Sequence, residues 1–399
     1  MKHTMSRHTF YSLTVTFTIL SILGQLSTSI YSPFFFDLAA IYDSCVGIIE
    51  KSVAVFLIAF SLSQLVSGVA CDYLNKQKFL LYGVLVFIAG TLMVALATEE
   101  NTFLVGRVIQ GLGGGVGVSV SRGLSRQIFS EKQLNVSLSF INIAFAIAPA
   151  IAPAIAPLVG TLIGESFGVS SIFYFVLVMG VFALLLLLSV STTLKQYMPT
   201  TSENVFSDTL ALIKSTMVKI VSVGMASGLL YGIVFSFITI SPSMIMQQFG
   251  LTKTVFSIYS LLATLSFVMG SIINIRLASV SPLFKFKYSS LFIAVLSVLF
   301  WLLISPFAIK GLMGILTYCY ITFFFIGIAM PCSVTIMLGY SDKSAGFLAA
   351  LTGFFHLTGA AIGAYAVTLI TLEPIISFCL SSCGLSVASI LICTTLKRN

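Results

Sequence analysis

The sequence predicts an all-α membrane protein with twelve transmembrane helices in two six-helix bundles. Hydrophobic residues fill 58% of the 399 positions and charged residues only 8%, too few charges to cover a water-exposed globule of this size. Apolar runs of about 20 residues, enough to cross a bilayer as helix, recur from end to end. One long polar stretch near the middle divides the chain into nearly equal halves.

The apolar runs give the expected positions of the twelve spans. They lie near residues 11–35, 50–70, 79–97, 102–124, 135–163, 168–190, 217–241, 253–275, 288–306, 311–338, 345–371 and 374–395. The first run is too long, and too closely followed by another span, to be a cleaved signal peptide. We therefore expect it to form helix 1.

The formal charge of +8 indicates orientation rather than a nucleic-acid partner. When the loops are counted alternately, one side holds most of the basic residues, namely Lys2, Arg7, Lys76, Lys78, Arg122, Arg126, Lys132, Lys195, Lys214, Lys219, Arg276, Lys285, Lys287, Lys343, Lys397 and Arg398. The positive-inside rule then predicts that both termini are cytoplasmic, which requires an even number of spans. We expect a multi-pass protein of a bacterial inner membrane, in contact with lipid.

The polar stretch at 191–214 sets the expected domain boundaries. They are an N-terminal bundle at 1–190, a cytoplasmic linker at 191–216 and a C-terminal bundle at 217–399. Two six-helix bundles related by an axis along the membrane normal form a transporter architecture with its substrate site near the midplane. Rocking of one half against the other would give alternating access.

The fifth span contains AIAPAIAPAIAPLVG at 146–160, with three prolines at four-residue spacing. An interior proline removes one backbone hydrogen bond and costs about 3 kcal/mol in a water-soluble helix. Pro149, Pro153 and Pro157 step round the helix by only about 40° each, so they share one face. The small residues there predict a packing element that closely approaches the opposite half of the protein.

Three stretches carry a resemblance to a known family. GVACDYLNKQK, after the second span, has Gly68, Asp72 and Lys76 in the places of a glycine, aspartate and basic-residue motif, although Tyr73 and Asn75 depart from it. The other two are GRVIQGLGGGVG in helix 4, which matches at Arg107, Gln110, Gly111 and Gly113, and APAIAPLVG in helix 5, which matches at Pro153, Pro157 and Gly160. Together they resemble the major facilitator superfamily and its twelve-span drug:proton antiporters.

Other stretches narrow the resemblance. GQLSTSIYSP, SRGLSRQIFSEKQL, FGLTKTVFSIY and SAGFLAALTGFFHLTGAAIGA are similar to the bicyclomycin-resistance (Bcr/CflA) group and its EmrD-type multidrug relatives. The resemblance implies the major facilitator fold. It leaves the substrate open, because polyspecific exporters and single-metabolite carriers share these motifs.

Arg107 is the only basic residue well inside an apolar span. An unpaired guanidinium is costly there, and an intramembrane charge favours a functional role in contact with substrate or a coupling group. The alternative is that Arg107 extends to the outer interface or bonds carbonyls of helix 1.

The positions of the acidic residues place no carboxylate inside an expected span, where it could couple transport to protons. All twelve carboxylates fall in expected loops or at helix ends, and Ser29 stands where the resembled group generally has an aspartate in helix 1. Asp37 and Glu50 at the outer rim and His356 in helix 11 remain as titratable candidates. An unperturbed histidine has a pKa of about 6.5, so His356 could support proton exchange; the alternative is a neutral histidine bonded to a hydroxyl or carbonyl.

Polar and aromatic residues complete the expected cavity. Gln25 and Gln110 are the favoured cavity liners among the buried amides, and Tyr31, Phe56 and Phe60 would form a greasy wall suited to amphipathic compounds. Packing is the alternative for each phenylalanine. The seven cysteines show no CxxC or Cys/His pairing, so we expect packing residues and no metal or disulfide.

The function we expect is proton-driven export of amphipathic drugs or small metabolites. The alternative is a carrier, exporter or importer, of one anionic or zwitterionic compound such as a siderophore or amino-acid derivative. An enzyme is disfavoured because one intramembrane histidine without an acid assembles no acid/base pair. We expect a monomer whose partner is a small-molecule substrate, with a proton gradient in place of any cofactor.

Overall fold

The computed structural model describes residues 5–70, 74–197, 206–307, 311–341 and 345–394, and nearly all of these are helical. In the first half of the chain lie α1 (Arg7–Ser29), η1 (Ser32–Phe34), α2 (Phe35–Ile41), α3 (Val46–Ala70), α4 (Lys76–Ala95), α5 (Glu100–Ile128), α6 (Glu131–Phe167), η2 (Gly168–Ser170), α7 (Ser171–Ser189) and α8 (Ser191–Tyr197). In the second half lie α9 (Phe206–Pro242), η3 (Ser243–Gln248), α10 (Lys253–Arg276), α11 (Pro282–Phe307), α12 (Leu312–Leu338), α13 (Ala345–Leu369) and α14 (Pro374–Thr394).

The helices confirm the expected all-α membrane fold. Within the described residues, 11 helices are long and apolar enough to cross a membrane. The remaining expected run, 135–163, lies in α6, a single helix from Glu131 to Phe167 with all three prolines inside it.

Two helix boundaries differ from the expected runs. The run at 11–35 is not one helix, because α1 ends at Ser29 and the short elements η1 and α2 follow. Pro33 lies in this break, where its ring and missing N–H oppose a continuous helix. The helix of the seventh span begins earlier than expected, since α9 starts at Phe206, although the candidate span within it starts at Thr216. The expected linker therefore contains α8 and the start of α9, while 198–205 lie outside the described residues.

The chain forms two compact units. Unit 1 comprises residues 1–31, 36–44 and 55–205, and unit 2 comprises 32–35, 45–54 and 206–399. Two short pieces depart from a simple division of the chain at its middle. The residues 32–35 and 45–54 come from the first half of the chain but belong to unit 2.

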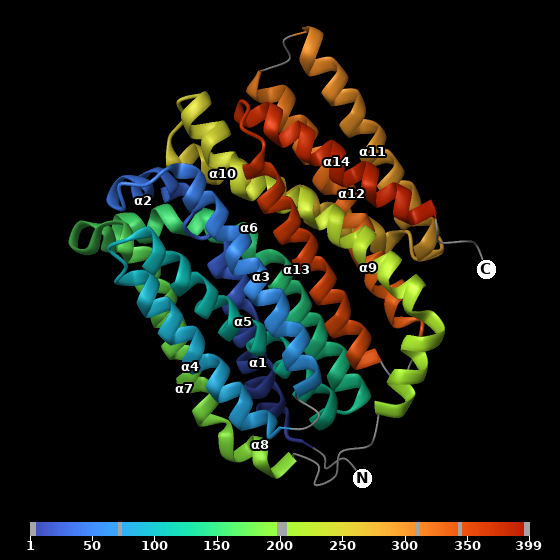
Figure 1. The fold of residues 1–399 in the computed structure, drawn as a ribbon. Helices are drawn as coiled ribbons and strands as arrows, with labels where there is room; N and C mark the ends of the chain where they lie inside the picture. The colour runs from blue at the N-terminus through green and yellow to red at the C-terminus, as the bar shows by residue number, and fades with distance from the viewer. Residues whose placement is uncertain (1–4, 71–73, 198–205, 308–310, 342–344, 395–399) are drawn as a thin grey trace. The chain divides into compact units, whose positions relative to one another are not determined.

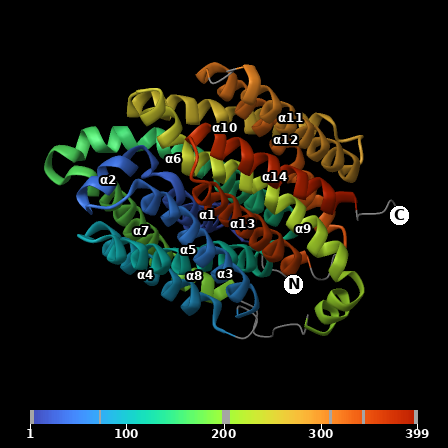
Figure 2. The same ribbon diagram turned by 45° about the horizontal axis from the view of Figure 1, so that its top comes forward.

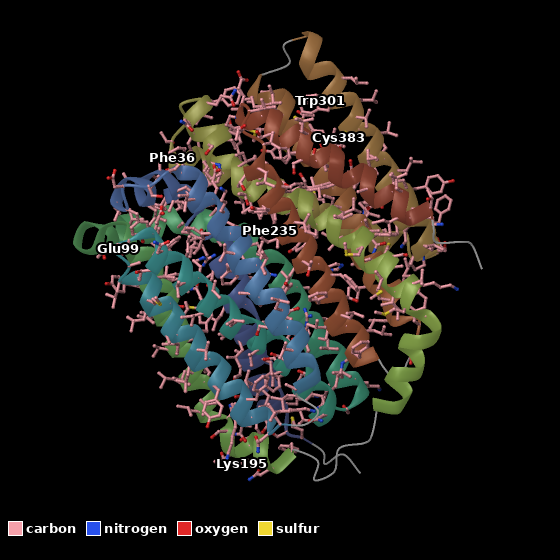
Figure 3. The ribbon with its side chains drawn as sticks, viewed as in Figure 1. Phe36, Glu99, Lys195, Phe235, Trp301 and Cys383 are labelled. Atoms are coloured by element: carbon pink, nitrogen blue, oxygen red, sulfur yellow. The ribbon has the colours of Figure 1, made fainter. Side chains whose placement is uncertain are left out.

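Unit 1 is held together around α1 and α5. The helix α1 packs against α5 and α6, and α4 packs against α5 and α7 (Figure 1). Glu99, which precedes α5, and Lys195 on α8 lie at opposite ends of this unit (Figure 3). The helices of unit 1 thus run between an end that carries Glu99 and an end that carries Lys195.

Unit 2 is organised around α9. This helix packs against α13 and α14, while α12 packs against α10 and α11 (Figure 2). A Cβ built on Gly228 or Gly232 of α9 would lie 2.3 Å from Phe355 O and 2.6 Å from Gly359 O of α13, respectively. Glycine at these positions lets the two backbones meet, because no side chain stands between them.

Candidate substrate and coupling site

Arg107 lies about two turns inside α5 and is completely buried. Its Nη1 donates to the backbone carbonyl oxygen of Ser27 at 2.9 Å and to Oε1 of Gln110 at 2.6 Å. The Ser27 carbonyl lies on α1, the first span, and the sequence offered such a bond as one alternative for Arg107. The 0% exposure shows that the side chain does not extend to the surface in this conformation.

Two aromatic rings hold the guanidinium of Arg107. Its Cζ lies 4.6 Å from the ring centroid of Tyr31 and 4.3 Å from that of Phe56. Such cation–π contacts contribute up to about 2 kcal/mol where water is excluded. The Tyr31 ring in turn packs against Phe103 at 6.0 Å and Phe173 at 5.8 Å. The charge is therefore fixed in position by groups that add no negative charge.

Glycines determine how the helices meet at this site. A Cβ on Gly90 of α4 would lie 2.3 Å from the Gln110 nitrogen, so only glycine lets α4 approach α5 this closely. The approach allows Nε2 of Gln110 to donate to Oγ1 of Thr91 at 2.9 Å. Gly111 is equally crowded, with Phe56 O 2.6 Å from a Cβ there, and it brings α3 against α5.

The site contains hydrogen-bonding groups that the described residues do not satisfy. Nε and Nη2 of Arg107 make no hydrogen bond of normal geometry within the described part of the chain, although the Tyr31 hydroxyl lies close to the guanidinium. Both amide atoms of the buried Gln25 also lack a partner there. Buried polar groups are normally paired. The unused Nε–Nη2 edge is the fork that binds a carboxylate through two parallel bonds.

Ser29 has a structural partner in α6. Its Oγ donates to the carbonyl oxygen of Pro149. That carbonyl would accept from the N–H of residue 153 in a regular helix, but Pro153 has no N–H to give. The serine of α1 thus replaces a bond that the proline removes, and it helps to hold α6 along α1.

His356 lies in unit 2, on α13, and is half-buried. Its Nε2 is 3.2 Å from Oγ of Ser227 on α9 and 3.3 Å from Oγ of Ser333 on α12. The Tyr231 ring lies 6.0 Å from the imidazole. Serine hydroxyls both donate and accept, so this pair of partners accommodates either protonation state of the ring.

The remaining predicted site residues fall in several environments. The Phe60 ring lies tilted against the Phe56 ring, with centroids 5.5 Å apart, and it packs over Gly24 of α1. Gly113 packs tightly on Phe87, with 2.2 Å between a built Cβ and the Phe87 nitrogen. Lys76 begins α4 and is buried.

Five further motif residues were predicted from the sequence. Gly68 and Pro157 lie inside α3 and α6, and Pro153 is buried. Asp72 and the surroundings of Gly160 lie outside the described residues.

Sequence reasoning missed Thr91 and Ser27. Thr91 and the backbone of Ser27 carry no sequence signal of their own, because their roles depend on which helices touch. Glu50, which was expected at the outer rim of the cavity, is 6% exposed. The described residues contain no group of three metal-ligating side chains, and the described cysteines are free thiols.

Comparison with known proteins agrees with this architecture. The family model of the Major Facilitator Superfamily matches residues 17–367. The uncharacterized MFS-type transporter YdgK of Bacillus subtilis is 24% identical over 348 residues, covering 85% of this chain and 84% of the relative. This chain therefore belongs to the Major Facilitator Superfamily, and it is a transport protein rather than an enzyme.

Other relatives match over shorter stretches. Multidrug resistance protein D of Escherichia coli is 25% identical over 144 residues, which is 36% of each chain. A bicyclomycin resistance protein homolog of Haemophilus influenzae is 30% identical over 137 residues, which is 34% of each chain. The match thus spans only about a third of the length of these two relatives.

Solved structures share the fold at low identity. The D-xylose-proton symporter has a TM-score of 0.71 at 12% identity, covering 96% of this chain and 97% of the other. A bacterial homolog of the human lysosomal transporter Spinster, in an inward-facing and unoccupied conformation, has a TM-score of 0.72 at 11% identity, covering 98% and 96%.

Proposed function

We propose that this protein is a secondary active transporter of the bacterial inner membrane that exports amphipathic drugs or small metabolites in exchange for protons. It works by alternating access, with both termini in the cytoplasm, and acts as a monomer. The observation that carries the proposal is the buried Arg107, clamped between Tyr31 and Phe56 with one edge of its guanidinium unused. A fixed charge between aromatic walls suits a compound with both a polar and a greasy part.

The unused edge of Arg107 also favours a second candidate, a carrier of one anionic or zwitterionic compound. The Nε and Nη2 groups would bind a substrate carboxylate through two parallel hydrogen bonds, and Gln25 offers further unpaired amide atoms. A purely cationic compound would gain nothing from this arrangement. The two candidates therefore differ in whether affinity requires a negative group on the substrate.

Inside-out membrane vesicles test the proposal. Uptake of ethidium, a cationic dye, and of norfloxacin, a zwitterionic aromatic carboxylate, is measured with and without an imposed pH gradient. The proposed exporter accumulates at least one probe only while the gradient lasts. Accumulation of norfloxacin alone favours the second candidate. Equilibration without any response to the gradient, for both probes and for a wider panel of anions, contradicts proton-driven export.

Reporter fusions test the proposed orientation. A reporter after Asn399 and another inserted near Thr201 should both register in the cytoplasm, because the basic residues concentrate at that side. A periplasmic signal from either fusion contradicts the topology.

A further inference from the structure

Glu50 combines burial, a specific bond and an unusual place in the fold. It is the fifth residue of α3 and is 6% exposed. It lies in the piece 45–54 that comes from the first half of the chain but clusters with the helices of the second half in unit 2. The same helix continues into unit 1 from Val55 onward. The start of α3 is thus attached to unit 2 while the rest of the helix is part of unit 1.

One hydrogen bond attaches the Glu50 side chain. Oγ of Ser243 donates to Oε1 of Glu50 at 2.6 Å, and Ser243 is itself 5% exposed. Ser243 is the first residue of η3, a π-helical turn that follows Pro242. Single π-helical turns occur frequently at functional sites, because they break the regular backbone ladder. The bond therefore joins α3 to an irregular segment at the end of α9.

Within the described residues, the charged groups on the elements around Glu50 make no ion pair with it. The neighbouring residue Lys51 is half-buried on α3, and η1 and η3 contain no charged residue. Lys253 of α10 lies over the Phe34 ring at 4.4 Å, and the exposed Glu373 precedes α14. No ion pair of Glu50 with any of the described residues occurs. An ionised carboxylate with one neutral donor is costly to bury, whereas the neutral acid is not.

We propose that Glu50 is the proton-binding group of this transporter and that its protonation closes the contact between α3 and η3. This inference rests on the proposed proton-driven transport and assigns its titrating residue. In the open state the carboxylate meets solvent and takes up one proton, forming an O–H bond at Glu50. The neutral acid then packs against Ser243, which still donates to it. Loss of that proton to water restores the charge and favours opening.

Closing of the α3–η3 contact by protonation at the outer face agrees with an exchange of substrate for protons. By the proposed topology, α3 begins at the outer face, where an exporter must bind a proton after releasing its substrate. A ligand that binds one state better shifts the equilibrium toward it, so external acid favours the closed contact. The first span has Ser29 where the resembled group generally has an aspartate. We assign the coupling role to Glu50 at the start of α3, the second span.

A distance measurement without substrate tests the inference. Cys45, exposed just before α3, and Thr254→Cys, exposed at the start of α10, are spin-labelled in a background whose other cysteines are replaced. Both positions belong to unit 2. In lipid nanodiscs between pH 5.5 and 8.5, acid should increase the population with the short distance. The population ratio should change by up to about tenfold per pH unit, the limit for one bound proton.

Matched variants make the test specific. Glu50→Gln is neutral but can still accept from Ser243, so it should hold the short distance at every pH. Glu50→Asp should still titrate. Glu99→Gln removes an exposed glutamate and should titrate like the wild type. A wild type without any pH-dependent shift, or a Glu50→Gln variant that shifts like the wild type, overturns the inference.

The outcome separates this inference from the proposed function. If the wild type shows the pH-dependent shift but no gradient-driven uptake of ethidium or norfloxacin, export fails and the proton site stands. If the wild type accumulates a probe with the gradient and Glu50→Gln does so equally well, the proton site fails and export stands.

Discussion

Arg107 in unit 1 and His356 in unit 2 differ in how far their nitrogens are hydrogen-bonded. Arg107 is wholly buried between two rings, and two of its nitrogens lack hydrogen bonds of normal geometry within the described residues. His356 is half-buried, and its Nε2 has a serine hydroxyl on either side. The unpaired N–H donors of the Arg107 guanidinium can bind a ligand. Nε2 of His356, in contrast, already has hydrogen-bond partners in two serine hydroxyls. Burial alone therefore does not identify a functional residue; the state of its hydrogen-bonding groups does.

Removing the charge of Arg107 should have the largest effect. Hydrogen bonds to a charged group contribute about 1.5–3 kcal/mol each, so loss of a two-bond fork should lower norfloxacin transport by roughly 100-fold or more in Arg107→Ala. Membrane insertion should not suffer, since loss of a central arginine eases it by up to ~3 kcal/mol. Transport by inside-out vesicles measures the first and membrane abundance the second.

Two further variants sharpen this result. Arg107→Lys keeps the charge but not the planar fork, and it should restore transport only partly. Arg276→Ala removes an exposed arginine at the end of α10 and should leave transport intact. A changed pH profile with unchanged affinity in Arg107→Ala would instead assign the residue to proton coupling. Unchanged transport would make it a structural residue.

Changing His356 should have a smaller effect. Interhelical hydrogen bonds in membranes contribute roughly 1 kcal/mol each, so His356→Gln should lower transport by only about fivefold. The pH dependence of transport should stay that of the wild type, because Glu50 is the proposed titrating group. Ser227→Ala removes one hydroxyl that bonds His356, and it is a matched control because we expect it to lower transport by a similar factor. A shifted pH profile in His356→Gln would place proton coupling in unit 2 at α13 instead.

The smallest predicted effect concerns the proline-rich α6 in unit 1. Ser29→Ala should lower the free energy of unfolding by about 1 kcal/mol, because the Pro149 carbonyl loses its donor. In a Pro153→Ala background the same change should cost almost nothing, since the restored N–H of residue 153 can reach that carbonyl. Unfolding in mixed detergent micelles measures all four proteins.

Ser27 provides the control for this double-mutant cycle. Its hydroxyl bonds the Leu23 carbonyl within α1, at 2.8 Å. The cost of Ser27→Ala should therefore be independent of residue 153. Equal costs of Ser29→Ala in both backgrounds would show that the Pro149 bond does not compensate for the proline.

The sequence by itself determined the class of fold and the place to look for function. Hydropathy is a local property, so apolar runs of membrane-spanning length identified the all-α membrane fold. A lone arginine inside such a run is costly enough to attract attention without any knowledge of its neighbours. The family motifs then indicated a transporter, which the match to residues 17–367 confirms.

Only the tertiary structure decided which groups meet. Thr91 reaches Gln110 because Gly90 lets α4 and α5 touch, and Ser29 reaches Pro149 because α1 runs along α6. Glu50 was expected at the outer rim of the cavity, and only the structure shows that it is buried and accepts a hydrogen bond from Ser243 of η3. Helix periodicity predicts which residues share a face, but the register and approach of two helices depend on side chains far apart in the chain. These contacts therefore cannot be derived from any single stretch of sequence.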